Sequence, residues 1–267
     1  MIISTYSDAQ ILKELHEDLA IIKENARKAS KKKLIKIISS GITSKEFIDE
    51  YEVTSPNNNR WFVTNSIKAN RRGQITTRAC CVVNTDKGKD YLVVRGTKWG
   101  GLFFLRVYAH VISRMKDRDK RKYKGMRSES VCNRIFQPHE LAFMFYTKQK
   151  DLERFWTNDV KEDVNSMIVA ESGVYFGGFY HNEDVGSCYI NIRTFITPEM
   201  IATHEQHDMY RCAKVHMELE KHSINKVEGS ICISYLKQTP ESKRLMEIVD
   251  EYKTSQFLID GMMVIPE

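Results

Sequence analysis

No uninterrupted apolar run in this sequence is long enough to predict a membrane-spanning helix. The opening residues, MIISTYSDAQ, lack the basic start, the apolar core and the small-residue cleavage site that mark a signal peptide. We therefore expect a cytoplasmic protein that has no membrane partner.

Sequence signatures of nucleotide and ester chemistry are also missing. The chain has no P-loop, no G-x-G-x-x-G between a strand and a helix, no G-x-S-x-G and no kinase motif set. ATP-driven and serine-hydrolase functions are therefore not expected. The cysteines form no C-x-x-C pair and most have apolar neighbours, which predicts buried reduced thiols rather than disulfides or a zinc site. They are Cys80, Cys81, Cys132, Cys188, Cys212 and Cys232.

The residues that are present, 42% hydrophobic and 28% charged over 267 positions, are typical of a globular protein of one large or two small domains. Apolar spacing predicts a helix over 8–29, capped by Ser7 or Asp8, and a second helix over 42–51. The stretch SPNNN at 55–59 predicts a loop. We place a domain boundary there, which separates an N-terminal helical segment, 1–55, from an α+β core domain, 56–267.

Beyond the loop the pattern becomes that of β-strands, rich in β-branched and aromatic residues. Strands are expected at WFVTNSIKA, QITTRACCVV, DYLVVRG and LFFLRV, and three antiparallel strands between 165 and 197. Helices are expected over 108–121, after Pro138 over 139–148, from a Thr197 cap to about His222, and over 242–252, with a loop at 119–130. The predicted fold is α+β, a mainly antiparallel sheet with packed helices and the N-terminal helical segment.

The stretch from Gly101 to Arg127 combines a predicted strand-to-helix junction with a concentration of charge. His110, Arg114 and Arg118 recur every four residues and therefore share one helical face. The neighbouring stripe of Val107, Val111 and Met115 is expected to pack on a sheet. Between Arg106 and Arg127 nine Lys/Arg and two Asp give a net charge of +7, which exceeds the +6 of the whole chain.

This combination suits RNA cleavage without a metal or cofactor. Histidine can move a proton near neutral pH, so His110 is the candidate acid or base. Arginine binds phosphate through paired N–H groups, which makes Arg114 and Arg118 candidate phosphate ligands. Arg193 and Thr194, at the end of a predicted strand, would complete the site. The alternatives are a capping or interhelical hydrogen bond for His110 and a solvated basic face for the two helix arginines.

The segment AHVISRMKDR, residues 109–118, resembles the H-x-x-x-R-h-x-x-R helix of ribonuclease-toxin domains in the barnase–EndoU–colicin–RelE group. The later SGVYFGGFYH and CYINIRTFIT resemble the strands that follow this helix in that group. The resemblance covers residues 105–197, about a third of the chain. It implies RNA phosphodiester cleavage, with His110 and Arg114 matching the helix residues and Thr194 the strand threonine, and an antitoxin as a protein partner.

Other charged segments carry weaker alternatives. Arg71 and Arg72 form a basic hairpin tip that predicts either a nucleic-acid contact or a charged turn that keeps a sheet edge soluble, and Arg121 extends the central basic run. His204 and His207, three residues apart, could share a metal with a carboxylate, but an exposed polar helix explains them, and we predict no metal. The lysine run from 28 to 36 is read as a helix end and linker or as a phosphate-contacting arm.

The sequence therefore predicts a protein that interacts with nucleic acid, with RNA favoured, and that acts as a metal-independent endoribonuclease of toxin type. The alternative is a non-enzymatic protein of a phage or mobile element. Such a structural, packaged or host-interacting component would use its basic surface for assembly on nucleic acid.

Overall fold

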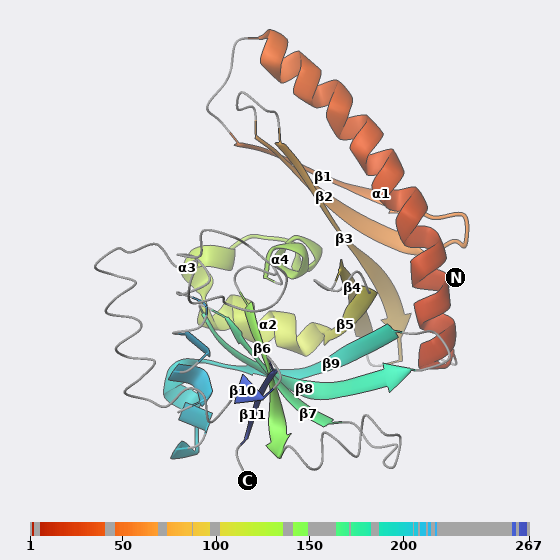
Figure 1. Ribbon diagram of the computed structural model, residues 1–267. Coiled ribbons are helices and arrows are strands. Elements are labelled where there is room, and N and C mark those ends of the chain that lie inside the picture. Colours follow the sequence, from red (N-terminus) through yellow and green to blue (C-terminus); the bar gives the residue numbers. More distant parts are fainter. Residues whose placement is uncertain are drawn as a thin grey trace.

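The computed structural model describes residues 2, 6–40, 46–68, 74–86, 88–96, 102–135, 141–148, 164–170, 172–182 and 187–204, with shorter pieces at 206–207, 209–211, 213–214, 217, 258–259 and 262–265 (Figure 1). The helices are α1 (Asp8–Ser39), α2 (Ala109–Arg118), α3 (Lys120–Tyr123) and α4 (Ser128–Ile135). The strands are β1 (Glu46–Thr54), β2 (Arg60–Lys68), β3 (Gln74–Thr85), β4 (Gly88–Gly96), β5 (Leu102–Tyr108), β6 (Leu141–Lys148), β7 (Val164–Ala170), β8 (Gly173–Asn182), β9 (Ser187–Ile196), β10 (Leu258–Ile259) and β11 (Met262–Ile265).

Within these residues the strands form one sheet of 11 strands in the order β1-β2-β3-β4-β5-β9-β8-β7-β6-β11-β10. Strands β1 to β5 make one antiparallel meander and β6 to β9 make another. The two meanders join through the parallel pair β5 and β9, in register from Phe103 opposite Cys188 to Val107 opposite Ile192. Strand β11 adds in parallel to β6. The predicted α+β class, with a mainly antiparallel sheet, is confirmed.

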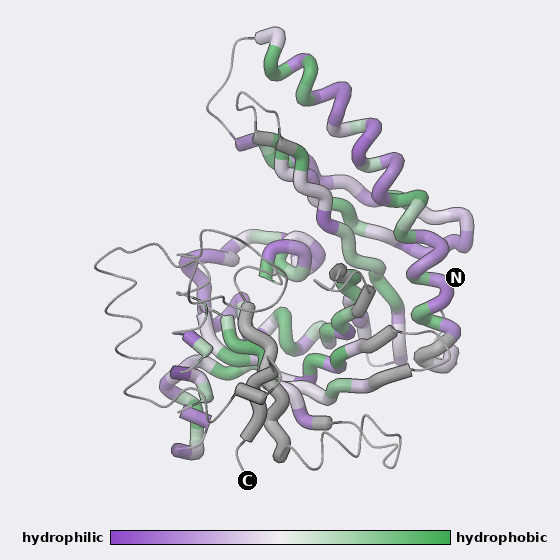
Figure 2. Tube along the Cα trace, in the orientation of Figure 1, coloured by the Kyte–Doolittle hydropathy of each residue, from purple (hydrophilic) through white to green (hydrophobic). Residues whose placement is uncertain are grey.

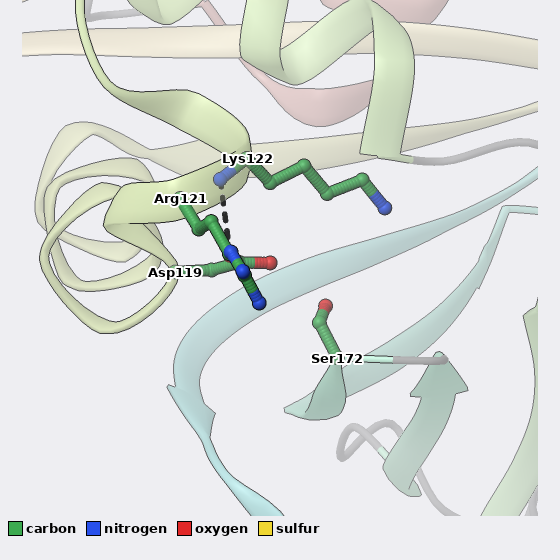
Figure 3. A pocket seen from close by; sticks show the side chains of 4 residues that line it. All are labelled: Asp119, Arg121, Lys122 and Ser172. Carbon is green, nitrogen blue, oxygen red and sulfur yellow. Dashed lines mark hydrogen bonds between the residues drawn. The ribbon is translucent and has the colours of Figure 1, made fainter.

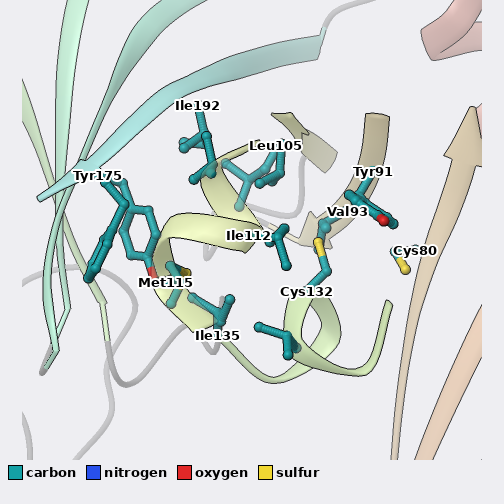
Figure 4. Packing of buried hydrophobic residues seen from close by; sticks show 14 of the residues in the cluster. Cys80, Tyr91, Val93, Leu105, Ile112, Met115, Cys132, Ile135, Tyr175 and Ile192 are labelled. Carbon is teal, nitrogen blue, oxygen red and sulfur yellow. Dashed lines mark hydrogen bonds between the residues drawn. The ribbon is translucent and has the colours of Figure 1, made fainter. Parts of the chain in front are cut away.

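Each face of the sheet is covered by helices. Helices α2, α3 and α4 lie between the two meanders (Figure 1) and pack against residues of both. Figure 4 shows this packing for side chains of α2 and α4. Helix α1 covers the opposite face of the first meander, where it buries Trp61, Val63 and Cys81. Helical residues Met209 and Met217 cover that same side of the second meander. Burial of both faces is why the centre of this region carries consecutive apolar residues, at 61–63 in β2 and 79–83 in β3.

Helix α1 begins at a capping box. The Ser7 hydroxyl accepts a hydrogen bond from the Gln10 backbone N–H, and the Gln10 side chain accepts one from the Ser7 N–H. Hydrophilic and hydrophobic residues alternate along the helix (Figure 2). The helix continues to Ser39, beyond the predicted end at 29, because Ala26 and Ser30 remain buried and Lys33 pairs with Asp49 at 2.5 Å. The prediction of a linker over the lysine run is therefore wrong.

A fully buried carboxylate fixes α1 to the turn between β1 and β2. Oδ2 of Asp18 accepts hydrogen bonds from Asn59 Nδ2 at 2.7 Å and Trp61 Nε1 at 3.1 Å, and Oδ1 accepts one from Asn57 Nδ2 at 3.1 Å. The backbone N–H of Ile2 donates to Asn59 Oδ1 at 2.6 Å. The predicted domain boundary lies in this turn, which joins two strands paired over their full length.

Three predicted elements are wrong where the structure describes them. Residues 46–54 form strand β1, not a helix, because alternate side chains are half-buried against the sheet and the others are exposed. The loop expected over 119–130 contains α3 and the start of α4, since Tyr123 and Val131 enter the core. Residues 141–148, expected to be helical, form β6.

The helix expected from a Thr197 cap starts later. Pro198–Met200 is a single 3-10 turn, and Thr203 provides the cap because its hydroxyl accepts from the Gln206 N–H at 3.2 Å. The helix expected over 242–252 lies outside the described residues.

The thiols of Cys80, Cys81 and Cys132 are free and buried, as predicted. The environments of the other three cysteine side chains lie outside the described residues. In the part of the chain that the structure describes, no helix is both long and apolar enough to cross a membrane.

A carboxylate at the β1 edge makes stability depend on pH. A hydrogen bond from Arg60, reinforced by Arg127, lowers the pKa of Glu52 from 4.5 to about 2. Because the folded-state pKa is depressed, the stabilisation is full above about 4.5 and is lost as pH falls toward 2. The Glu52 side chain is 37% exposed, so solvent screening keeps its contribution below about 1 kcal/mol. We expect Glu52→Gln to be less stable than wild type near neutral pH, by a margin that shrinks on acidification.

Urea unfolding of both proteins over a pH series measures this margin, with Glu17→Gln, an exposed α1 position, as the control. A margin that stays constant down to pH 2 would contradict the assignment.

Candidate nucleic-acid interface

Helix α2 begins where strand β5 ends. Tyr108 is the last strand residue and, with φ −74° and ψ 147°, also the N-terminal cap of the helix. The predicted apolar stripe of Val107, Val111 and Met115 is confirmed, because all three side chains are fully buried. The buried stripe fixes the rotation of α2 and therefore fixes where its polar residues lie.

The polar residues of α2 contact three consecutive residues of β9. His110 Nε2–H donates to the Arg193 carbonyl oxygen at 2.8 Å, Arg114 Nη1 donates to Thr194 Oγ1 at 2.7 Å, and Arg118 Nη1 donates to the Phe195 carbonyl oxygen. Because a carbonyl oxygen only accepts, the His110 contact places a proton on Nε2. Among the described residues Nδ1 of His110 has no hydrogen-bond partner. We call these five residues, His110, Arg114, Arg118, Arg193 and Thr194, the α2–β9 face.

A β-bulge positions the strand side of this face. Along β8 and β9, Gly177 pairs with Ile192 while the adjacent Phe176 pairs with Thr194, so Arg193 is the extra residue. The bulge takes Arg193 out of the regular ladder, and its carbonyl oxygen is the one that His110 reaches. Arg193 Nη2 donates to the Tyr180 hydroxyl at 3.0 Å, so the bulged side chain is held over β8.

Comparison with known protein families, curated proteins and solved structures finds no match to this chain. A functional assignment therefore has to come from the residues and geometry of the chain itself.

Aromatic rings continue the face toward the end of β5. The Tyr108 ring stacks on the His110 ring, with centroids 5.8 Å apart and planes 9° apart. The Arg106 guanidinium lies 5.8 Å from the centre of the Tyr108 ring and is itself held by Asp90 Oδ2 at 2.9 and 3.0 Å. Burial raises the pKa of Tyr108, so its phenol is neutral at physiological pH.

At its other end the face runs into a shallow hollow of about 320 Å³ (Figure 3). Asp119, which follows Arg118 in sequence, lines it together with Arg121 and Lys122 from α3 and Ser172 from the turn between β7 and β8. Asp119 Oδ1 accepts a hydrogen bond from the Lys122 backbone N–H at 3.2 Å, which orients the short helix. The hollow thus presents two cations and a hydroxyl beside one carboxylate.

The structure brings together the residues that the sequence nominated on α2 and β9 and places Arg121 at the hollow. Arg71 and Arg72 lie outside the described residues. Sequence reasoning missed Tyr108, Tyr180 and Ser172. Tyr108 could have been found, because it shares one face of the strand end with Arg106 and precedes His110 by two residues. The other two reach the site only through the pairing of β7, β8 and β9.

The second histidine group lies elsewhere. His204 and His207 are exposed, whereas Glu205, Asp208, His216 and His222 lie outside the described residues. Among the residues that the structure describes, no group of three or more His, Cys, Asp or Glu is arranged to hold a metal ion.

Proposed function

We propose that the α2–β9 face binds RNA and that His110 acts there as the acid or base of a metal-independent endoribonuclease. The supporting observation is the alignment of His110, Arg114 and Arg118, on successive turns of α2, with three consecutive residues of β9. An exposed imidazole and exposed or half-exposed guanidinium groups are thereby fixed in one line.

The arginines keep donors for a ligand. A guanidinium carries five N–H groups, and the contacts of Arg114 and Arg118 with β9 each engage one Nη atom. The remaining edge of each fork can bind phosphate oxygens in the paired geometry that arginine favours. Arg106 and Arg127 are paired with Asp90 and Glu52, but the seven Lys/Arg and two Asp from Arg114 to Lys124 leave a net charge of +5 that attracts a polyanion.

The chemistry uses the free nitrogen of His110. Nδ1 accepts the proton of the ribose 2′-hydroxyl, whose oxygen attacks the adjacent phosphorus while the bond to the 5′-oxygen breaks and that oxygen takes up a proton from water. The products are a 2′,3′-cyclic phosphate and a 5′-hydroxyl end. Arg114 and Arg118 bind the extra negative charge that forms on the phosphorus oxygens. RNA is favoured over DNA because only RNA supplies this internal nucleophile.

Cleavage of labelled RNA by purified protein in EDTA tests the catalytic step. We expect His110→Ala to lower the cleavage rate by about a hundredfold or more, which is the usual contribution of a general acid or base, while RNA binding persists. Cleavage by wild type that His110→Ala leaves unchanged would contradict the role of His110.

Binding is tested separately by the dependence of affinity on salt. Arg114→Gln with Arg118→Gln should weaken RNA binding and reduce the slope of log K against log salt by about one per lost phosphate contact. Arg27→Gln, an exposed arginine on the opposite side of the sheet, is the matched control. Salt-sensitive binding without cleavage leaves a non-enzymatic nucleic-acid-binding protein, and an absence of binding overturns the proposal.

A further inference from the structure

An aromatic stack stands directly beside the phosphate-binding groups of the α2–β9 face. The Tyr108 ring contacts both neighbours, because the Arg106 guanidinium and the His110 imidazole each lie 5.8 Å from its centre. The stack ends at His110, which is exposed. A planar group that settles on the outer face of this ring would continue the stack and would lie one helical turn, about 6 Å, from Arg114.

A second tyrosine approaches from the other meander. Tyr180 on β8 stacks on Tyr189 with ring centroids 4.6 Å apart and planes 6° apart. Its hydroxyl accepts the hydrogen bond from Arg193, and both residues lie near enough to Tyr108 to influence its pKa. The half-buried Tyr108 and Tyr180 and the exposed Arg193 therefore lie at the same end of the α2–β9 face.

We infer that the ligand of the α2–β9 face is single-stranded, with an unpaired base stacked on the Tyr108–His110 pair, phosphates on Arg114 and Arg118, and the next nucleotide in the hollow at Arg121 and Lys122. This inference rests on the proposed function and adds the class of substrate. A base inside a duplex already has neighbours on both faces and cannot join the protein stack, whereas a single strand offers its bases and its backbone together.

The proposed contact points follow one another along the α2–β9 face, from the aromatic stack to the arginines and then the hollow. The rise along α2 between Arg114 and Arg118 is about 6 Å, a spacing that neighbouring phosphates of an extended single strand can match. The hollow follows immediately and, at about 320 Å³, offers room to a nucleotide rather than to a bare phosphate alone. The bound segment therefore spans several nucleotides, and a mononucleotide makes only part of these contacts.

Fluorescence anisotropy compares a labelled single strand with the same strand annealed to its complement. The strands carry 2′-O-methyl groups, which remove the internal nucleophile and so prevent cleavage during the titration. We expect the single strand to bind about tenfold more tightly at equal salt, because stacking on an aromatic platform contributes on that scale per base. Tyr108→Leu should lose about that factor for the single strand only, and Tyr108→Phe should retain it.

A second variant keeps the test decisive if Tyr108→Leu folds poorly. Arg121→Gln with Lys122→Gln changes exposed side chains, and we expect it to weaken binding of the longer strand but not of a dinucleotide. Equal affinity for duplex and single strand, or equal binding by Tyr108→Leu and wild type, overturns the single-strand inference while leaving a phosphate-binding face. Failure of both nucleic acids to bind overturns the proposed function itself.

Discussion

Gly177→Ala is expected to destabilise the protein by about 3 kcal/mol, at the upper end of the cost of overpacking. A Cβ atom at this position would lie 2.1 Å from the carbonyl oxygen and 2.9 Å from the carbonyl carbon of Asn191. Both atoms belong to the backbone of β9, which is paired on both sides, so they cannot move without breaking the sheet. Urea unfolding followed by circular dichroism measures the change.

Gly125→Ala is the matched control. Gly125 has a φ of +76°, but a Cβ there would meet nothing within 4 Å, so this substitution should cost only about 1 kcal/mol of backbone strain. Equal losses at the two positions would show that close packing of β8 on β9 is not the cause. Gly177 also pairs with Ile192, next to the bulge that His110 contacts. Gly177→Ala should therefore shift the NMR signals of His110.

Asp18→Ala is expected to destabilise the protein by about 3 kcal/mol. The carboxylate is fully buried, and its loss leaves the buried Trp61 Nε1–H without its acceptor and removes one acceptor from the Asn59 amide. Unsatisfied buried donors lose their hydrogen bonds to water and gain nothing in return. Chemical denaturation again gives the difference in free energy of unfolding.

Glu17→Ala, at the neighbouring exposed position of α1, should change stability by less than about 0.5 kcal/mol. If Asp18→Ala lowered the free energy of unfolding as little as Glu17→Ala, the hydrogen bonds of Asp18 would not be what holds α1 on the sheet. A loss confined to α1, seen as early hydrogen exchange of its amides, would show that the helix detaches before the sheet unfolds.

The polar face of α2 could be predicted because it depends only on local spacing. His110, Arg114 and Arg118 recur at the helical period, and the buried neighbours Val111 and Met115 fix which way that face points. The strands β2 to β5 and β7 to β9 were likewise predictable, because β-branched and aromatic runs between turn residues carry the pattern locally.

Features that depend on distant partners could not be predicted. Residues 46–54 carry spacings compatible with a helix, and only pairing with β2 along the whole strand makes them extended. The bulge at Arg193 depends on where β8 pairs with β9, and nothing within CYINIRTFIT indicates the extra residue. Ser172 and Tyr180 reach the site for the same reason.

The contacts between α2 and β9 join residues 77 to 83 positions apart in the chain. The hairpins of each meander involve close neighbours and can form early, whereas closing a loop of this length is slow. During synthesis, the first meander and α2 emerge well before β9. The cationic residues between Arg106 and Arg127 emerge with them. The line of groups proposed to bind and cut RNA is therefore assembled only when the second meander docks, so the nascent chain is basic long before it contains the complete site.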